Sequence, residues 1–529
     1  MAKKSKLKAR STRSNSLYVK YYKWWLLGVL VIAFGFYFGL FFTAFGIVDF
    51  YDEVSEVTGF GYPSDKHSLF LGFILRPLFL TGHGLLIYEL INQVLVVWIL
   101  WKALMLLDSL GTARKVINGL VIFYVLYPYS FFISNYLSKD QLLAVITFAF
   151  FVQLFKVSKI KDPTKKDWLV LGIWLALTIL LKVFSVLLVF ALIPVWWKHR
   201  RRTKIFALVG AVSVILPLLF NQIAMIAYGI HSRNDVQASN VAIVVAGQIF
   251  GDPNATISED QRQYYEDLYK NSAFEAFNPG LDVTRWWEAS NPFLSDKLKD
   301  PLLSSDVNVW DLNSRTLGLC FSNLGTCLRS YLVLMSGYYM PYEILYATTG
   351  LVRYPYFSNW TRSDNLDSIL PTSTITWNTL RFCGEAGTDG QPVGEPIDFE
   401  RYKSCMVENI GENGNPVADS LRPAIRATPL SGSLMPSVAQ GLIDIANFFK
   451  FFLEGFWLFW TSLTLLIISL IKKQFENIRP LLWGIMIFYL GLFVFSPISY
   501  ERYLFPLYWL LPFVIGTFFI PPPRSARKS

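Results

Sequence analysis

Ionisable side chains gather at four points of this chain, three where a long apolar run begins or ends and one, Lys182, within such a run. A carboxylate at such a place can take a proton from an attacking hydroxyl, and Arg or Lys can hold a phosphate leaving group. The same residues can instead anchor helix ends at a membrane interface, so their spacing alone leaves both interpretations open. The residues concerned are Asp52, Asp65 and His67 in the segment 49–67, then Lys139-Asp140, Lys182 and Glu501-Arg502.

The elements that must position these residues are long apolar runs. The chain has 529 residues, of which 53% are hydrophobic and 16% are charged, whereas a soluble chain usually carries about a quarter charged residues. A run such as Trp24–Val48 is long enough to cross a hydrocarbon core about 30 Å thick. Because a helix satisfies its own backbone groups inside lipid, the sequence predicts an all-α polytopic membrane protein that lies in a lipid bilayer.

The chain has a net charge of +10, but the distribution of its charged residues indicates a membrane topology rather than nucleic-acid binding. Residues 1–23 hold eight Lys and Arg and no acid, whereas residues 231–448 hold 25 acids against 15 bases. Basic residues collect in the short cytoplasmic loops of membrane proteins. Both termini are therefore expected in the cytoplasm, with 231–448 outside the cell, and the apolar run Trp24–Val48 is too long for a cleaved signal peptide.

About ten spans obey the charge rule at every turn, and their predicted cytoplasmic segments hold 26 Lys and Arg against four acids. The run 168–197 is divided near Lys182–Ser185, because one helix would place the five bases of 198–204 outside. The apolar run Tyr331–Tyr346 is not counted, because a span there would invert every later loop. The predicted spans are 24–48, 85–107, 117–135, 141–155, the two halves of 168–197, 205–230, 451–471, 480–496 and 503–520.

These spans divide the chain into two membrane modules separated by one outer domain of mixed secondary structure, between the seventh and eighth spans. The N-terminal module has seven spans and the C-terminal module has three. The predicted parts are a basic tail (1–23), the N-terminal module (24–230, with an outer loop at 49–66 and an interfacial helix at 67–81), the extracytoplasmic domain (231–448), the C-terminal module (449–520) and a second tail (521–529).

The four cysteines all fall in the predicted outer domain. In an oxidising compartment they would form two disulfides, although their spacing does not settle which pairs form. A zinc site is less favoured, because no tight CxxC spacing and no nearby His is present. The cysteines are Cys320, Cys327, Cys383 and Cys405.

This layout resembles the GT-C superfamily of membrane glycosyltransferases, and it is most similar to an uncharacterised bacterial family of GT-C-like envelope proteins. The likeness covers nearly the whole chain, and the order of short motifs carries it. The similar segments are Tyr51-Asp52, Ser64-Asp65-Lys66-His67, Ser138-Lys139-Asp140, Leu181-Lys182-Val183, Val241–Gln248, Asn278-Pro279 with Asp282, Gly337-Tyr338-Tyr339 and Arg502-Tyr503-Leu504-Phe505-Pro506. The chain departs from the family pattern at Lys66, Ser68, Ser138 and Val183-Phe184.

The resemblance implies an inverting glycosyltransferase of the bacterial plasma membrane. It would move a sugar from a polyprenyl-phosphate donor to an envelope glycan, lipid or protein on the outer face. Asp52 would be the general base, with Asp65 and Asp140 as further catalytic carboxylates. A divalent metal is compatible with such a site, although no residue is assigned to it. The implied substrate-binding residues are His67, Lys139, Lys182, Arg502, Tyr338 and Tyr339.

Two other functions fit the same pattern. A transporter or flippase for lipid-linked sugars would also need a polar site between helices, although internal repeats and mid-membrane charges are more typical of it. A non-catalytic envelope scaffold would explain the departures from the family motifs. The sequence predicts neither the sugar, the acceptor nor the oligomeric state.

Overall fold

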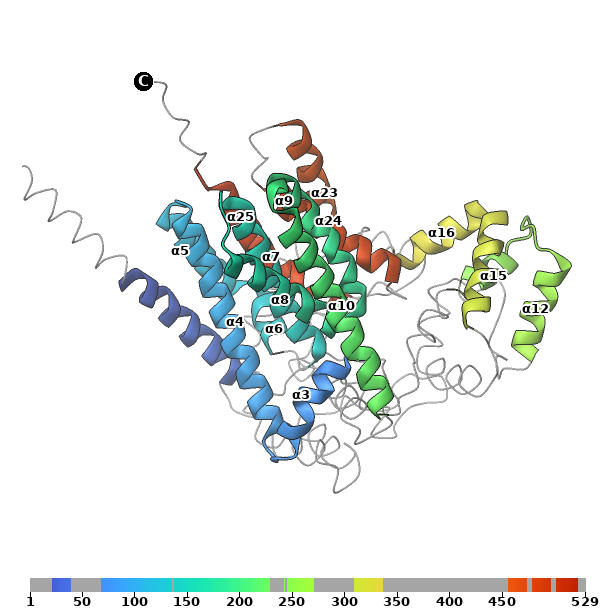
Figure 1. The fold of residues 1–529 in the computed structure, drawn as a ribbon, viewed down its shortest axis with the longest axis horizontal. Coiled ribbons are helices and arrows are strands. Elements are labelled where there is room, and N and C mark those ends of the chain that lie inside the picture. Colours follow the sequence, from blue (N-terminus) through green and yellow to red (C-terminus); the bar gives the residue numbers. More distant parts are fainter. Residues whose placement is uncertain are drawn as a thin grey trace, which may run out of the picture.

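The computed structural model shows a helical protein, and the regular secondary structure that it describes contains no strand (Figure 1). This agrees with the predicted all-α membrane part. Four of the described helices are long and apolar enough to cross a membrane, namely Tyr21–Gly39, α4 (Gly84–Ser109), α7 (Lys139–Lys159) and a stretch Arg200–Ala227 that contains most of α10 (Thr203–Tyr228). The structure describes residues 21–39, 68–135, 138–228, 242, 245–270, 309–335, 455–472, 478–495 and 501–521.

Helix α7 lies at the centre of the bundle (Figure 1). In its apolar part 89% of the residues are buried, against 17% for the Arg200–Ala227 helix, so α7 packs against protein while α10 exposes an apolar face suited to lipid. Other helices pack tightly onto α7. A Cβ added to Gly484 would lie 2.9 Å from the Phe151 ring, and such small residues allow close approach between membrane helices. The neighbours of α7 are α4, α8 (Lys165–Leu181), α24 (Arg479–Phe495) and α25 (Phe505–Phe518).

The run 168–197 turns back on itself at Lys182. Helix α8 ends at Leu181, and Lys182 has an extended backbone (φ −152°, ψ 115°) before the chain continues as η1 (Val183–Leu192) and α9 (Ile193–Lys198). The Trp168 and His199 rings meet edge to face at 5.8 Å, so the two ends of this segment lie together. The predicted division near Lys182–Ser185 is therefore confirmed as a reversal of the chain.

Basic loops lie together at the end of the bundle opposite Lys182. Lys156 Nζ is 2.9 Å from Asp167 Oδ1, and Lys198 Nζ donates to the carbonyl of Ser158. The guanidinium of Arg202, in the short η2 helix (Arg200–Arg202), lies 3.4 Å from Asp162. These contacts join the loops around 156–167 and 198–202, which the charge pattern had grouped on one side of the membrane.

One predicted span is wrong in detail. Instead of a single helix at 117–135, the chain forms α5 (Arg114–Leu126) and α6 (Pro128–Ser134), with an extended Tyr127 between them. Pro128 has no backbone N–H to donate and restricts the residue before it to extended backbone, which ends α5.

A helix, α3 (Leu69–Phe79), occupies the segment 67–81, where an interfacial helix is predicted, and a tight turn joins it to α4. Gly82 has a φ of +74°, a conformation that favours glycine. A Cβ added to Gly84 would lie only 2.7 Å from the Phe79 Cα. The turn therefore depends on the missing side chain at residue 84.

Replacing Gly84 by Ala is expected to lower the unfolding temperature of the purified protein, because overpacking typically costs about 1–3 kcal/mol. The matched control is Gly119→Ala in α5, where nothing lies within 4 Å of the added Cβ. This control should be neutral or slightly stabilising. The measurement is the loss of the monodisperse peak after heating in detergent. Equal midpoints for the two variants would contradict the close contact at Gly84.

The described parts of the predicted outer domain form a separate group of helices beside the bundle (Figure 1). Tyr265 on α12 shares a hydrogen bond of 2.6 Å with Thr316 on α15, and burial raises the pKa of this tyrosine to about 12. Since no strand occurs among these described residues, the mixed character expected for 231–448 is not found there. The helices are α12 (Glu259–Lys270), α15 (Val309–Ser322) and α16 (Leu324–Met335).

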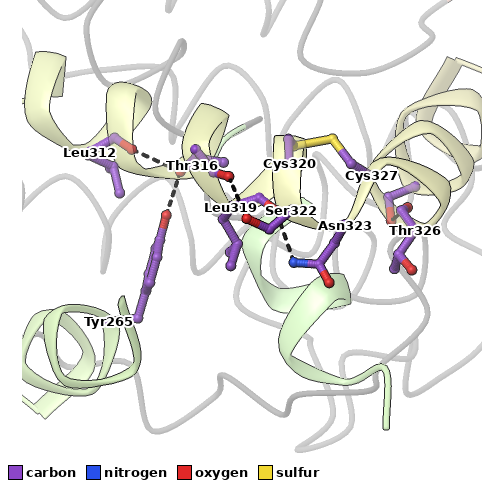
Figure 2. The surroundings of a disulfide bond; sticks show 11 residues. Tyr265, Leu312, Thr316, Leu319, Cys320, Ser322, Asn323, Thr326 and Cys327 are labelled. Carbon is purple, nitrogen blue, oxygen red and sulfur yellow. Dashed lines mark hydrogen bonds between the residues drawn. A yellow bond between two sulfur atoms is a disulfide. The ribbon is translucent and has the colours of Figure 1, made fainter. Parts of the chain in front are cut away.

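A disulfide between Cys320 and Cys327 joins α15 to α16 across the Asn323 turn (Figure 2). Asn323 Nδ2 donates to the Thr256 carbonyl at 2.8 Å, and Asn323 Oδ1 accepts from the Thr256 amide at 2.6 Å. The disulfide and these bonds fix the corner of the helical group. One of the two expected disulfides is thus present and its pairing is given, while Cys383 and Cys405 lie outside the described residues.

Reduction of this disulfide is expected to destabilise the α15–α16 corner by about 2–3 kcal/mol, as the loop-entropy relation gives for so short a loop. The measurement is hydrogen exchange of the peptides covering α15 and α16, with and without reductant. A Cys320→Ser/Cys327→Ser variant is the control, because its exchange should match the reduced protein and should not respond to reductant. Equal protection of all three samples would contradict a structural role for the pair.

Candidate functional site

A buried ion pair joins the start of α7 to the reversal at Lys182. Lys182 Nζ lies 3.3 Å from Asp140 Oδ1, and the Asp140 side chain is fully buried while that of Lys182 is 16% exposed. Because both charges are removed from bulk water, removing one partner of such a pair lowers the stability of the fold. The pair therefore fixes two segments of the chain relative to each other.

The position of Asp140 follows from how α7 begins. The extended Ser138 caps the helix, and its hydroxyl accepts from the Asp140 amide at 3.1 Å. Asp140 then lies in the first turn, where the helix dipole favours a negative charge. Lys139 beside it is also buried, with 5% of its surface exposed. The Ser-Lys-Asp order of the sequence thus forms a helix start with two charged side chains held in the bundle.

The Lys182 ammonium also lies over an aromatic ring. Its Nζ is 3.7 Å from the centroid of the Tyr503 ring, a cation–π contact. Tyr503 belongs to the 3-10 turn η8 (Glu501–Leu504), directly before α25. The carboxylate and the ring together orient an ammonium that carries three N–H donors. Such a group can bind an anionic oxygen.

A second polar cluster lies next to the ion pair, between α4 and α7. Gln141 Oε1 accepts from Asn92 Nδ2 at 3.1 Å, and Gln141 Nε2 donates to Glu89 Oε2 at 3.4 Å. These three side chains are at most 1% exposed, although they lie in apolar helices. Buried polar groups in a membrane bundle are expensive unless they are paired. This cluster therefore calls for a functional or positional explanation.

The structure brings together only part of the predicted site. It joins Asp140 to Lys182 and places Tyr503, the neighbour of Arg502, against them. For Arg502 itself only the backbone, in η8, is described. Five further predicted site residues lie outside the described residues, so their positions stay predictions. These five residues are Asp52, Asp65, His67, Tyr338 and Tyr339.

Sequence reasoning missed the polar cluster on α4. Glu89, Asn92 and Gln93 have the i, i+3, i+4 spacing that places three polar side chains on one face of the first half of the 26-residue helix α4. That spacing was visible in the sequence and could have marked the face. No group of three His, Cys, Asp or Glu suited to a metal ion occurs among the described residues. A metal site that includes residues 52, 65 or 67 would lie outside the described residues.

Comparison with family models, curated proteins and solved structures gives no match to this chain.

Proposed function

We propose that the chain is an inverting GT-C-type glycosyltransferase that moves a sugar from a polyprenyl-phosphate donor to a cell-envelope acceptor. The observation that carries the proposal is the buried contact among Asp140, Lys182 and Tyr503. Each residue belongs to a different segment that resembles a GT-C motif, and the three segments lie far apart in the sequence. A site built from these motifs requires such a convergence, whereas residues that only anchor helix ends at a membrane interface need no contact with one another.

The contact offers the chemistry that such a donor needs. The oriented Lys182 ammonium can hold a phosphate oxygen as a point charge, and a nearby carboxylate can accept a proton from the attacking hydroxyl. The polyprenyl tail would lie along the apolar faces of the helices while the phosphate remains near the headgroups. In this proposal Asp52 is the general base, Asp65 and His67 position the acceptor, and Arg502 supplies a bidentate phosphate contact.

The placement of the site on the outer face is part of the same proposal. The basic loops around 156–167 and 198–202 lie at the opposite end of the bundle, and the positive-inside rule assigns that end to the cytoplasm. The Cys320–Cys327 disulfide fits an oxidising compartment for the helices that follow α10. We therefore propose a bacterial plasma-membrane protein with ten spans and both termini in the cytoplasm.

The test is native mass spectrometry of the purified protein with a synthetic polyprenyl monophosphate as the probe. The wild-type protein is expected to retain the lipid, and Lys182→Gln should lose most of it. A polyprenyl-phosphate glucose is then supplied with envelope extract as the acceptor, and sugar transfer is followed by radiolabel. Equal lipid binding by wild type and Lys182→Gln, or binding by neither, counts against the proposal; the latter favours a scaffold.

A transporter of lipid-linked sugars is the second candidate, and Glu89 favours it. This carboxyl group is 1% exposed inside the apolar helix α4, and ionisable residues buried in membrane helices often lie on transport pathways. Flux of a labelled lipid-linked sugar across proteoliposomes, without sugar transfer, would select this function over the enzyme.

A further inference from the structure

We propose that Gln141 and Glu89 are positioning residues, which hold the Asp140–Lys182 pair in place through an amide–acid contact between α7 and α4. The inference deepens the proposed function and rests on it where activity is concerned. The position of the Asp140–Lys182 pair can be tested without any enzyme activity.

The side chain of Gln141 uses both ends of its amide. Its Oε1 accepts from Asn92 at 3.1 Å, and its Nε2 donates to Glu89 at 3.4 Å and to the Ser134 carbonyl at 2.6 Å. The residue follows Asp140 directly on α7. Removing the amide would leave buried groups on α4 and at the end of α6 without this partner, which typically costs about 1–3 kcal/mol for each unsatisfied group.

Helix α4 also binds the backbone on both sides of the connection between α6 and α7. The Tyr88 hydroxyl donates to the Ser138 carbonyl at 3.0 Å, and Gln93 Nε2 donates to the Ser134 carbonyl at 2.5 Å. Polar side chains of α4 thus hydrogen-bond the backbone at the end of α6 and directly before α7. The start of α7, and with it Asp140, is fixed relative to α4.

A small displacement is enough to break the pair. The Lys182–Asp140 separation of 3.3 Å is already at the long end for a charged hydrogen bond. None of the hydrogen bonds described for Glu89 or Asn92 involves Asp140 or Lys182. These two α4 residues therefore act through Gln141 and the start of α7, and they are positioning residues.

The acid and the amide of the Glu89–Gln141 contact can be exchanged between the two positions by mutation. No ion pair of Glu89 occurs in the part of the chain that the structure describes, where its partner is the Gln141 amide. Gln141→Glu alone would face one carboxyl group with another and remove a donor. Glu89→Gln combined with Gln141→Glu again gives one acid opposite one amide, so the double variant should restore the contact.

The experiment measures how fast a small amine-reactive reagent labels Lys182 in the purified full-length protein, resolved by peptide mass spectrometry. Gln141→Leu and Gln141→Glu are expected to speed labelling about fivefold, the factor that corresponds to one net hydrogen bond. The Glu89→Gln/Gln141→Glu variant should return part of the way to the wild-type rate, because it restores the contact with residue 89 but not the donor to the Ser134 carbonyl. The matched control is Gln153→Leu, because Gln153 lies on the same helix but donates to the Asp167 carbonyl at 2.9 Å, near the basic loops; its Lys182 labelling should not change.

Unchanged labelling of Lys182 in Gln141→Leu overturns the inference, and so does a double variant that labels as fast as Gln141→Glu. If Gln141→Leu fails to fold, the comparison between Gln141→Glu and the double variant decides. In the transfer assay, kcat should fall in Gln141→Glu and recover in the double variant. A labelling change in a protein whose wild type transfers no sugar would keep the positioning role and reject the proposed function.

Discussion

Lys182→Ala is expected to destabilise the helical bundle by about 3–5 kcal/mol, which is the usual cost of removing one partner from a buried ion pair. The side chain of Asp140 is fully buried, so without the ammonium it keeps a charge that water cannot reach. Thermal unfolding of the purified protein in detergent measures the effect.

Two matched variants separate this cost from a general loss of packing. Lys156→Ala removes an ion pair whose lysine is 40% exposed, and exposed pairs are worth only about 0–1 kcal/mol. The double variant Asp140→Ala/Lys182→Met replaces both charges by apolar groups and should regain most of the lost stability. A Lys182→Ala protein as stable as Lys156→Ala would show that the buried pair is not formed.

Asp52→Asn is expected to lower kcat for sugar transfer by about 10²–10⁴-fold, the usual contribution of a general base. The asparagine keeps the size of the side chain and removes its ability to take a proton. Asp52 lies outside the described residues, so this expectation rests on the resemblance of Tyr51-Asp52 to the GT-C motif. Transfer is measured with a polyprenyl-phosphate glucose donor, and Glu56→Gln, in the same acidic loop, is the control.

Arg502→Ala should also lower transfer strongly, because the proposed function assigns a phosphate contact to this side chain. The protein must stay folded and membrane-inserted in the Asp52→Asn and Arg502→Ala variants for the result to count. Normal turnover of Asp52→Asn and Arg502→Ala, with Glu56→Gln also normal, would reject the proposed enzyme.

The reversal at Lys182 could be predicted from sequence because charge placed it. The five bases of 198–204 cannot lie outside without breaking the positive-inside rule, so the 30-residue run had to turn. Hydropathy does not predict the break at Pro128, because the run 117–135 is predominantly apolar on both sides of the proline. Hydropathy measures length and composition, and it does not register a missing backbone donor.

The pairing of side chains could not be predicted. Asp140 and Lys182 were both singled out as residues at span ends, yet their contact depends on α7 and α8 running antiparallel and in the right register. Gln141 meets Glu89 and Asn92 across 52 and 49 residues of chain. The spacing of the polar residues on α4 predicts that they share one face of the helix, but only the packing of α4 against α7 determines that Gln141 is their partner.

The location of Lys182 at the tip of a helical hairpin has a consequence for biogenesis. The two arms of this hairpin, α8 and η1–α9, are short for independent membrane insertion. On the proposed topology Lys182 must pass the bilayer centre to reach the outer face, and a lysine at that depth costs about 2.5–3.5 kcal/mol on insertion scales. Since α7 precedes the hairpin in the chain, the proposed topology has Asp140 at the outer face before Lys182 arrives there. Asp140 can therefore pair with Lys182 as soon as the hairpin inserts, because the carboxylate precedes the lysine in the order of synthesis.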